Sequence, residues 1–254
     1  MVELETVELR VDGLRLTGAL FVPPGPGPHP GLIICHGLPQ GAPPANGDSG
    51  YPGLAQRFCG GGFAVLIFNF RGTGESQGNF DILGWARDLE CATDYLWDRQ
   101  DVDWMRVYVL GSSAGGAVAL YGASWDRRLA GVVAWAAPAR WDVLVNPQAF
   151  LQHARSIGIV RDANFPTSVA QWAYSFEEVT PERWVKRIAP RPILIVHGDA
   201  DDVVAPEQAR KLYEVAGEPK ELFILPGVGH RLRLEEQAVA KSLGWLRSQA
   251  KLEA

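Results

Sequence analysis

Two kinds of hydrophobic pattern follow one another along this 254-residue chain. Residues 7–10 and 14–22 alternate apolar and polar side chains around the dipeptide Asp12-Gly13, which predicts an antiparallel β-hairpin. After a loop rich in proline and glycine, short runs appear in which nearly every residue is apolar. Such runs are typical of strands covered on both faces, as in a parallel sheet with helical crossovers. The runs are 31–35, 64–70, 107–110, 131–136, 193–196 and 221–225.

Helical spacing of apolar residues fills most of the intervals between these runs. The sequence therefore predicts the α/β class, specifically about eight mostly parallel strands with helices on both faces, in a single domain over residues 1–254. The interval 138–190 has no strand pattern and is rich in aromatic residues. We interpret it as a small insertion after the sixth strand, either a cap over a site or a structural subdomain. The predicted helices are 82–97, 114–124, 206–215 and 234–249.

Composition narrows the function without identifying it. The net charge of -5, with no block of basic residues, argues against nucleic-acid binding and favours a small neutral or apolar ligand. No run is long enough to span a membrane, and the acidic start lacks the basic and apolar regions of a secretory signal. We therefore expect a cytoplasmic protein. Three scattered cysteines, Cys35, Cys59 and Cys91, form neither a disulfide framework nor a metal-binding pattern, so we expect them in the core.

The strongest local motif is Gly-Ser-Ser-Ala-Gly at residues 111–115, between a predicted strand and a predicted helix. A serine at such a turn is held in a strained conformation that exposes its hydroxyl, and the flanking glycines avoid collisions with neighbouring chain. Ser113 is the serine centred between the two glycines. We therefore predict that Ser113 is a nucleophile.

A serine hydroxyl needs a nearby base, which histidine most often provides. Of the five histidines, His29 lies in the proline-rich loop and His153 in the aromatic insertion. His36 and His197 each end an apolar run and precede a glycine, which suits a role in shaping a loop. His230 follows the last strand, at the sheet edge where open α/β folds assemble their ligand sites, and we predict that it is the base.

The third member of such a site is a carboxylate that orients the histidine. Three candidates, Asp199, Asp201 and Asp202, lie in the loop after the run 193–196. At least one of them is expected only to cap the helix that begins near Pro206. No phosphate-binding loop and no metal-binding cluster competes with the serine motif, so we expect neither a cofactor nor a metal.

Over nearly its whole length the sequence resembles the α/β-hydrolase superfamily. Five features carry the resemblance: the 111–115 motif, His36-Gly37, the turn 71–76, the His197-Gly-x-x-Asp201 loop and Gly229-His230. The order Ser, Asp, His is the order found in that superfamily.

The resemblance implies roles for individual residues. It implies Asp201 as the acid, with Asp199 and Asp202 as alternatives, and an oxyanion hole made by the backbone N–H groups of Leu38 and Ala114. Small carboxylesterases of the feruloyl or cinnamoyl kind are the most similar group.

We therefore expect a serine carboxylesterase that forms an acyl-enzyme on small to medium acyl or aryl esters, with a small-molecule ester as its partner. A peptidase, thioesterase or perhydrolase would use the same three residues. The absence of an N-terminal propeller of the prolyl-oligopeptidase kind favours an esterase over a peptidase. A non-catalytic ligand-binding member of the fold is a further alternative.

Overall fold

The computed structural model describes residues 2–39, 48–141 and 145–252. Eight strands form one sheet in the order β1-β2-β4-β3-β5-β6-β7-β8. β1 pairs with β2 and β2 with β4 in antiparallel fashion, and all the other neighbours are parallel. The predicted mostly parallel sheet is confirmed. The strands are β1 Glu3–Val11, β2 Leu14–Val22, β3 His29–Cys35, β4 Ala64–Phe68, β5 Val102–Ser112, β6 Leu129–Trp135, β7 Ile193–Gly198 and β8 Lys220–Leu225.

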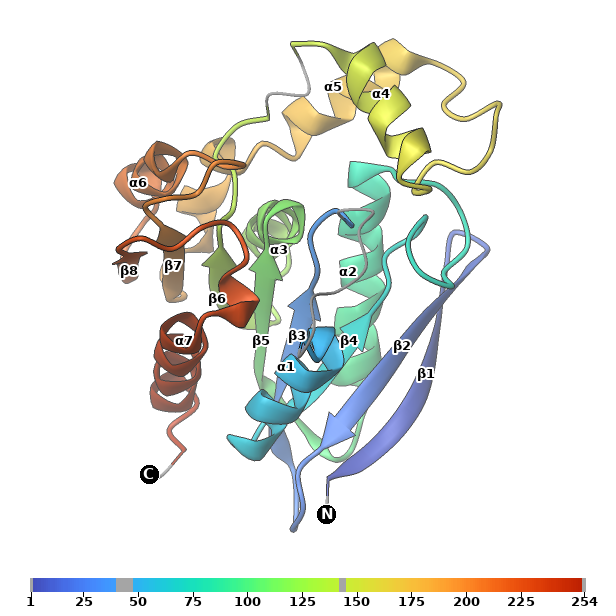
Figure 1. The fold of residues 1–254 in the computed structure, drawn as a ribbon. Helices are drawn as coiled ribbons and strands as arrows, with labels where there is room; N and C mark the ends of the chain where they lie inside the picture. The colour runs from blue at the N-terminus through green and yellow to red at the C-terminus, as the bar shows by residue number, and fades with distance from the viewer. Residues whose placement is uncertain (1, 40–47, 142–144, 253–254) are drawn as a thin grey trace.

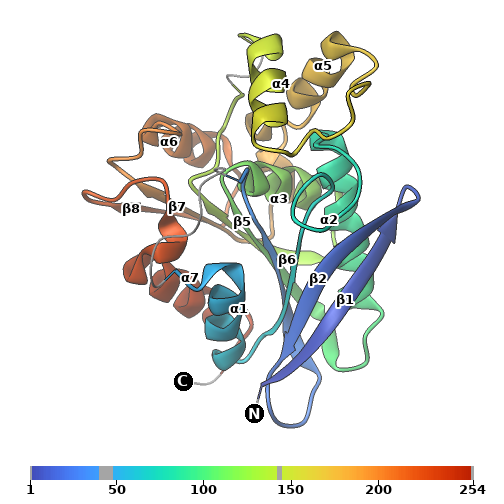
Figure 2. The same ribbon diagram turned by 45° about the vertical axis from the view of Figure 1, so that its right-hand side comes forward.

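Helices cover both faces of the sheet, as predicted (Figures 1 and 2). On one face α1 and α7 bury Phe58 and Leu246 against the strands. On the other face α2, α3 and α6 bury Leu89, Val118 and Leu212. Burial of an apolar helix face against the sheet is the main source of stability in such a layered fold. The helices are α1 Gly50–Gly60, α2 Ile82–Trp97, α3 Ala114–Trp125, α6 Pro206–Val215 and α7 Glu236–Gln249.

The aromatic interval between β6 and β7 contains four helices and no strand among its described residues. Its helices α4 and α5 lie at the top of Figure 1, above α2 and α3. They are held there by an aromatic cluster around Phe80, whose ring centroid is 5.8 Å from Phe176 and 6.2 Å from Trp172. A role of this segment as a cap stays a prediction. Its helices are α4 Pro147–Ser156, α5 Val169–Glu178 and the 3₁₀ helices η2 Pro181–Arg183 and η3 Val185–Ile188.

Several elements differ from the prediction: β1 begins at Glu3 instead of Val7, and α4 and α5 lie where no helix was predicted. Two further differences, in α1 and β5, arise because tertiary contacts outweigh a weak local signal. The helix α1 was not predicted, since Gly50, Pro52 and Gly53 weaken its pattern; it forms because its apolar side chains are buried. The strand β5 begins five residues earlier than predicted, at Val102, where charged residues and the exposed Trp104 and Met105 interrupt the apolar pattern. Its pairing with β3 shifts register between Pro30 and Gly31, which accommodates the extra segment.

The cysteines partly follow the prediction. Cys35 and Cys59 are buried in the core, whereas Cys91 is half-buried; all three are free thiols. Burial raises the pKa of the Cys59 thiol to about 11, which makes it a poor nucleophile. Within the part of the chain that the structure describes, no helix is long and apolar enough to cross a bilayer.

Candidate active site

Ser113 lies at the turn where β5 ends and α3 begins. Its backbone has φ 54° and ψ -123°, a left-handed conformation that costs energy for any residue other than glycine. The Ser113 N–H donates a hydrogen bond to the Trp135 carbonyl at the end of β6, at 2.7 Å. The strained turn is therefore held by the neighbouring strand, and the predicted strand–serine–helix geometry is present.

The glycines on either side of Ser113 are required by space. A Cβ atom on Gly111 would lie 2.3 Å from the Gly115 carbonyl oxygen, and one on Gly115 would lie 2.3 Å from the His36 carbonyl oxygen. Both distances are far below van der Waals contact. The motif thus packs the turn directly against the end of β3, which brings the His36-Gly37 segment to Ser113. A Cβ on Gly37 would lie only 2.9 Å from the Ser113 Cβ.

Asp201 and His230, predicted from separate loops, are hydrogen-bonded to each other. His230 Nδ1 lies 2.8 Å from Asp201 Oδ2. The other oxygen, Asp201 Oδ1, accepts from the backbone N–H groups of Val203 and Val204, each at 2.9 Å. Of the two alternatives, Asp199 accepts from the Gly227 N–H at 2.6 Å. Asp202 is exposed. The geometry favours Asp201 as the partner of His230.

Hydrogen bonding keeps the Asp201 carboxylate charged although its side chain is fully buried. Burial by itself raises the pKa of Asp201, but hydrogen bonds from His197, His230 and two backbone N–H groups outweigh it and hold the pKa well below its usual range. An ionised carboxylate at this position stabilises a proton on the histidine. The pair can therefore serve as an oriented base.

The loops that carry the pair touch through Gly198, the last residue of β7. A Cβ there would lie 2.0 Å from the Val228 carbonyl oxygen. Ala200 N–H also donates to this oxygen, at 3.0 Å. The loop before His230 is thus fixed directly on the loop before Asp201.

His36 orients the peptide that joins Gly37 to Leu38. Its Nε2 accepts from the Phe70 N–H at 3.2 Å, so the ring proton is on Nδ1, which donates to the Gly37 carbonyl at 2.7 Å. Desolvation lowers the pKa of His36, and the bond to Gly37 opposes this. Because N–H and C=O point in opposite directions in a trans peptide, the Leu38 N–H faces away from the His36 ring. Ala114 begins α3, so its N–H has no acceptor within the helix.

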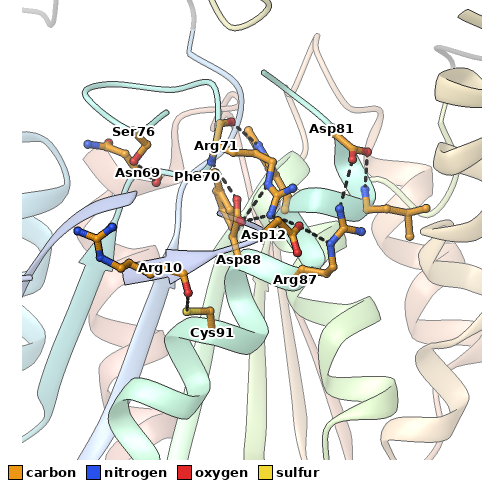
Figure 3. A network of polar contacts seen from close by, with 12 residues as sticks. Arg10, Asp12, Asn69, Phe70, Arg71, Ser76, Asp81, Arg87, Asp88 and Cys91 are labelled. Carbon is orange, nitrogen blue, oxygen red and sulfur yellow. Dashed lines mark hydrogen bonds and ion pairs between the residues drawn. The ribbon is translucent and has the colours of Figure 1, made fainter. Parts of the chain in front are cut away.

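A buried ion pair supports the Phe70 N–H that holds His36 (Figure 3). The Arg71 side chain donates to Asp88 Oδ1 at 2.6 and 2.9 Å, and the Arg71 N–H donates to Asp88 Oδ2 at 2.9 Å. Arg71 also pairs with Asp12 of the β1–β2 turn, at 2.8 Å. The carboxylate of Asp88 is fully buried. The turn after β4 is therefore tied both to α2 and to the first hairpin.

Two residues of the site were missed or undervalued by the sequence prediction. Tyr51 of α1 lies 6.0 Å from the His36 ring, between centroids. Burial raises the pKa of the Tyr51 phenol, and hydrogen bonds with the Gly37 backbone and the Ser112 side chain partly oppose this rise. No local motif marks Tyr51. His197, expected only to shape a loop, has its Nε2 3.2 Å from Asp201 Oδ2; its place in the His197-Gly-x-x-Asp201 loop was the available signal.

Most of the chain matches the sequence model of a known protein family. Residues 53–253 match the model of the prolyl oligopeptidase family. The uncharacterized protein Rv2307c of Mycobacterium tuberculosis is 30% identical over 223 residues, which span 86% of this chain and 69% of that protein.

Solved structures share the fold at low sequence identity. The α/β hydrolase GrgF from Penicillium sp. sh18 has a TM-score of 0.78 and 23% identity, with 98% of this chain and 100% of that chain covered. The esterase Pf2001 of Pyrococcus furiosus has a TM-score of 0.71 and 22% identity, and the match covers 98% of this chain and 93% of that chain. These likenesses, together with the sheet order, show the α/β-hydrolase fold.

Proposed function

Because the chain belongs to the prolyl oligopeptidase family and has the α/β-hydrolase fold, we propose that it is a serine carboxylesterase with Ser113, His230 and Asp201 as its catalytic residues. The observation that carries this proposal is the 2.8 Å hydrogen bond between His230 and Asp201, at the sheet edge where the strained Ser113 turn lies. Nucleophile, base and orienting acid come from the loops after β5, β8 and β7.

The reaction follows from these roles. Ser113 Oγ attacks the ester carbonyl while His230 Nε2 takes the hydroxyl proton, and Asp201 stabilises the imidazolium that forms. His230 then gives the proton to the departing alcohol, which leaves an acyl group on Ser113. Water, activated by the same histidine, attacks the acyl-enzyme and releases the acid. No cofactor takes part in any of these steps.

The negative oxygen of each tetrahedral intermediate is assigned to the backbone N–H groups of Leu38 and Ala114. The His36 hydrogen bond to the Gly37 carbonyl supports the first assignment, because it fixes the orientation of the peptide that carries the Leu38 N–H. The free first N–H of α3 supports the second. Preorganised donors of this kind are worth about 3 kcal/mol each in the barrier.

Esters are proposed ahead of amides, although the family name includes peptidases. The many aromatic residues between β6 and β7 favour a short acyl or an aryl group over a long lipid chain. A thioesterase or peptidase would use the same three residues and differs only in the leaving group.

The test is a substrate panel with matched variants. We expect wild-type protein to hydrolyse 4-nitrophenyl acetate and butyrate, and Ser113→Ala to lose this activity by about 10⁴-fold or more. Ser112→Ala is the control, since its hydroxyl lies outside the proposed mechanism. Ester hydrolysis that persists undiminished in Ser113→Ala would refute the nucleophile. Faster turnover of aminoacyl 4-nitroanilides than of esters would replace the esterase assignment with a peptidase.

A further inference from the structure

His197 is a fully buried histidine beside the proposed catalytic pair. It lies on β7, one residue before Gly198, and its exposure is 0%. Its Nε2 is 2.8 Å from the Val204 carbonyl oxygen and 3.2 Å from Asp201 Oδ2. Both neighbours are acceptors, so the ring proton is on Nε2. Its Nδ1 is buried and has no hydrogen-bond partner among the described residues, so with the proton on Nε2 the ring donates from that nitrogen alone.

This single N–H is directed at the turn that presents Asp201. Val203 and Val204 donate their backbone N–H groups to Asp201 Oδ1, and the Val204 carbonyl turns back to His197. Val204 is therefore held by two side chains: its N–H donates to Asp201 and its carbonyl accepts from His197. Asp201 Oδ2, which His230 Nδ1 contacts at 2.8 Å, also lies within 3.2 Å of the His197 Nε2 that donates to Val204.

We propose that His197 is a positioning residue, which fixes the Asp201 carboxylate and, by sharing Oδ2 with His230, limits how strongly that carboxylate stabilises the His230 cation. This inference rests on the proposed function for its kinetic consequence, but not for its structural content. It assigns His197 no contact with substrate.

The direction of the effect follows from electrostatics. A donor on Oδ2 withdraws negative charge from the oxygen that His230 faces, which agrees with the contribution of His197 to the lowered pKa of Asp201. Without this donor, the carboxylate would hold more negative charge on Oδ2 and would stabilise the imidazolium of His230 more strongly. The base would then become protonated, and inactive, at a higher pH.

Other charged or titratable groups lie in the loops of the pair or contact residues of those loops, and a change at His197 leaves them in place. They include Asp199 and Asp202 in the Asp201 loop, Arg231 next to His230, the Arg233–Asp48 ion pair, and the phenol of Tyr51, whose ring lies 5.8 Å from the Arg233 guanidinium. A shift that depends on the donor at position 197 therefore reports on the contact with Asp201.

The experiment compares two substitutions of the same residue. His197→Gln keeps an N–H donor near the Nε2 position, whereas His197→Phe keeps a flat ring of similar size and removes the donor. In His197→Phe we expect the acid limb of the kcat/KM profile for 4-nitrophenyl butyrate to move up by roughly half to one pH unit. His197→Gln should keep the wild-type limb, and KM should be unchanged in both variants.

A limb that stays in place in His197→Phe, moves to lower pH, or moves equally in both variants would overturn the inference. If His197→Phe does not fold, nitrogen chemical shifts of the wild-type ring decide the question. Nδ1 must then have the shift of an unprotonated nitrogen, and a proton found on Nδ1 would overturn it.

A direct titration separates this inference from the proposed function. The His230 ring pKa is measured by NMR in the unliganded protein, with the resonance assigned by its loss in His230→Gln. A higher His230 pKa in His197→Phe than in His197→Gln supports the positioning role even if no ester is hydrolysed, in which case the proposed function alone has failed. Equal His230 pKa values in the two variants would refute the positioning role while leaving the esterase assignment intact.

Discussion

Replacing Gly198 with alanine is expected to lower kcat by about 100-fold. The new Cβ would lie 2.0 Å from the Val228 carbonyl oxygen and 2.9 Å from that of Gly229. To lengthen the distance between the new Cβ and the Val228 oxygen from 2.0 Å to about 3.0 Å, the two loops must separate by about 1 Å. One loop ends at His230 and the other at Asp201, so the separation opens their 2.8 Å hydrogen bond. Misplacement of a catalytic group by about 1 Å costs about 100-fold in rate.

The assay is steady-state hydrolysis of 4-nitrophenyl butyrate, with circular dichroism to verify that the variant is folded. KM is expected to change little, because the contact lies behind the proposed base and not in a substrate pocket. Gly229→Ala is the matched control, since its Cβ would come no closer than 3.9 Å to any atom outside its two chain neighbours, at the Ala200 carbonyl oxygen. Its kcat should remain within about threefold of wild type. A Gly198→Ala variant with kcat inside the same range would refute the reasoning.

Two further predictions concern stability. Asp88→Asn should lower the free energy of unfolding by about 3 kcal/mol, since it leaves the buried Arg71 guanidinium underpaired; Asp94→Asn, which breaks an exposed pair with Arg128, should cost less than about 1 kcal/mol. Urea unfolding measures both, and equal losses would contradict the account. Because the pKa of Asp201 is depressed on folding, its ionised form stabilises the protein above the unfolded pKa of about 3.9, and this is lost as pH falls through the folded pKa. The stability difference between wild type and Asp201→Asn should therefore shrink below about pH 4, and a difference that grows on acidification would be inconsistent with it.

The sequence was sufficient for features whose cause is local. The apolar runs predicted the central strands, because strands buried on both faces have little choice of residue. The motif 111–115 predicted a strained turn, and the structure gives the reason in the contacts of Gly111 and Gly115. The hydrogen bond between His230 and Asp201 joins a histidine predicted from its position after the last strand to the acid that the superfamily resemblance implied among three candidates.

What could not be predicted depends on contacts between distant segments. The helix α1 has a weak pattern of its own and forms because Leu54 and Phe58 are buried against the sheet. For the same reason Tyr51 at its start could not be placed near His36. The role of His197 depends on which acceptors its Nε2 meets; its place in the His197-Gly-x-x-Asp201 loop indicated nearness to Asp201 but not these contacts.

The central claim is that Ser113 is the nucleophile and that His230 activates it. Incubation of the folded protein with a fluorophosphonate probe, followed by peptide mass spectrometry, tests this most directly. We predict a single adduct on Ser113, with labelling that is abolished in Ser113→Ala and strongly slowed in His230→Gln. An adduct on Ser112, or a folded protein that the probe does not label, would contradict the account.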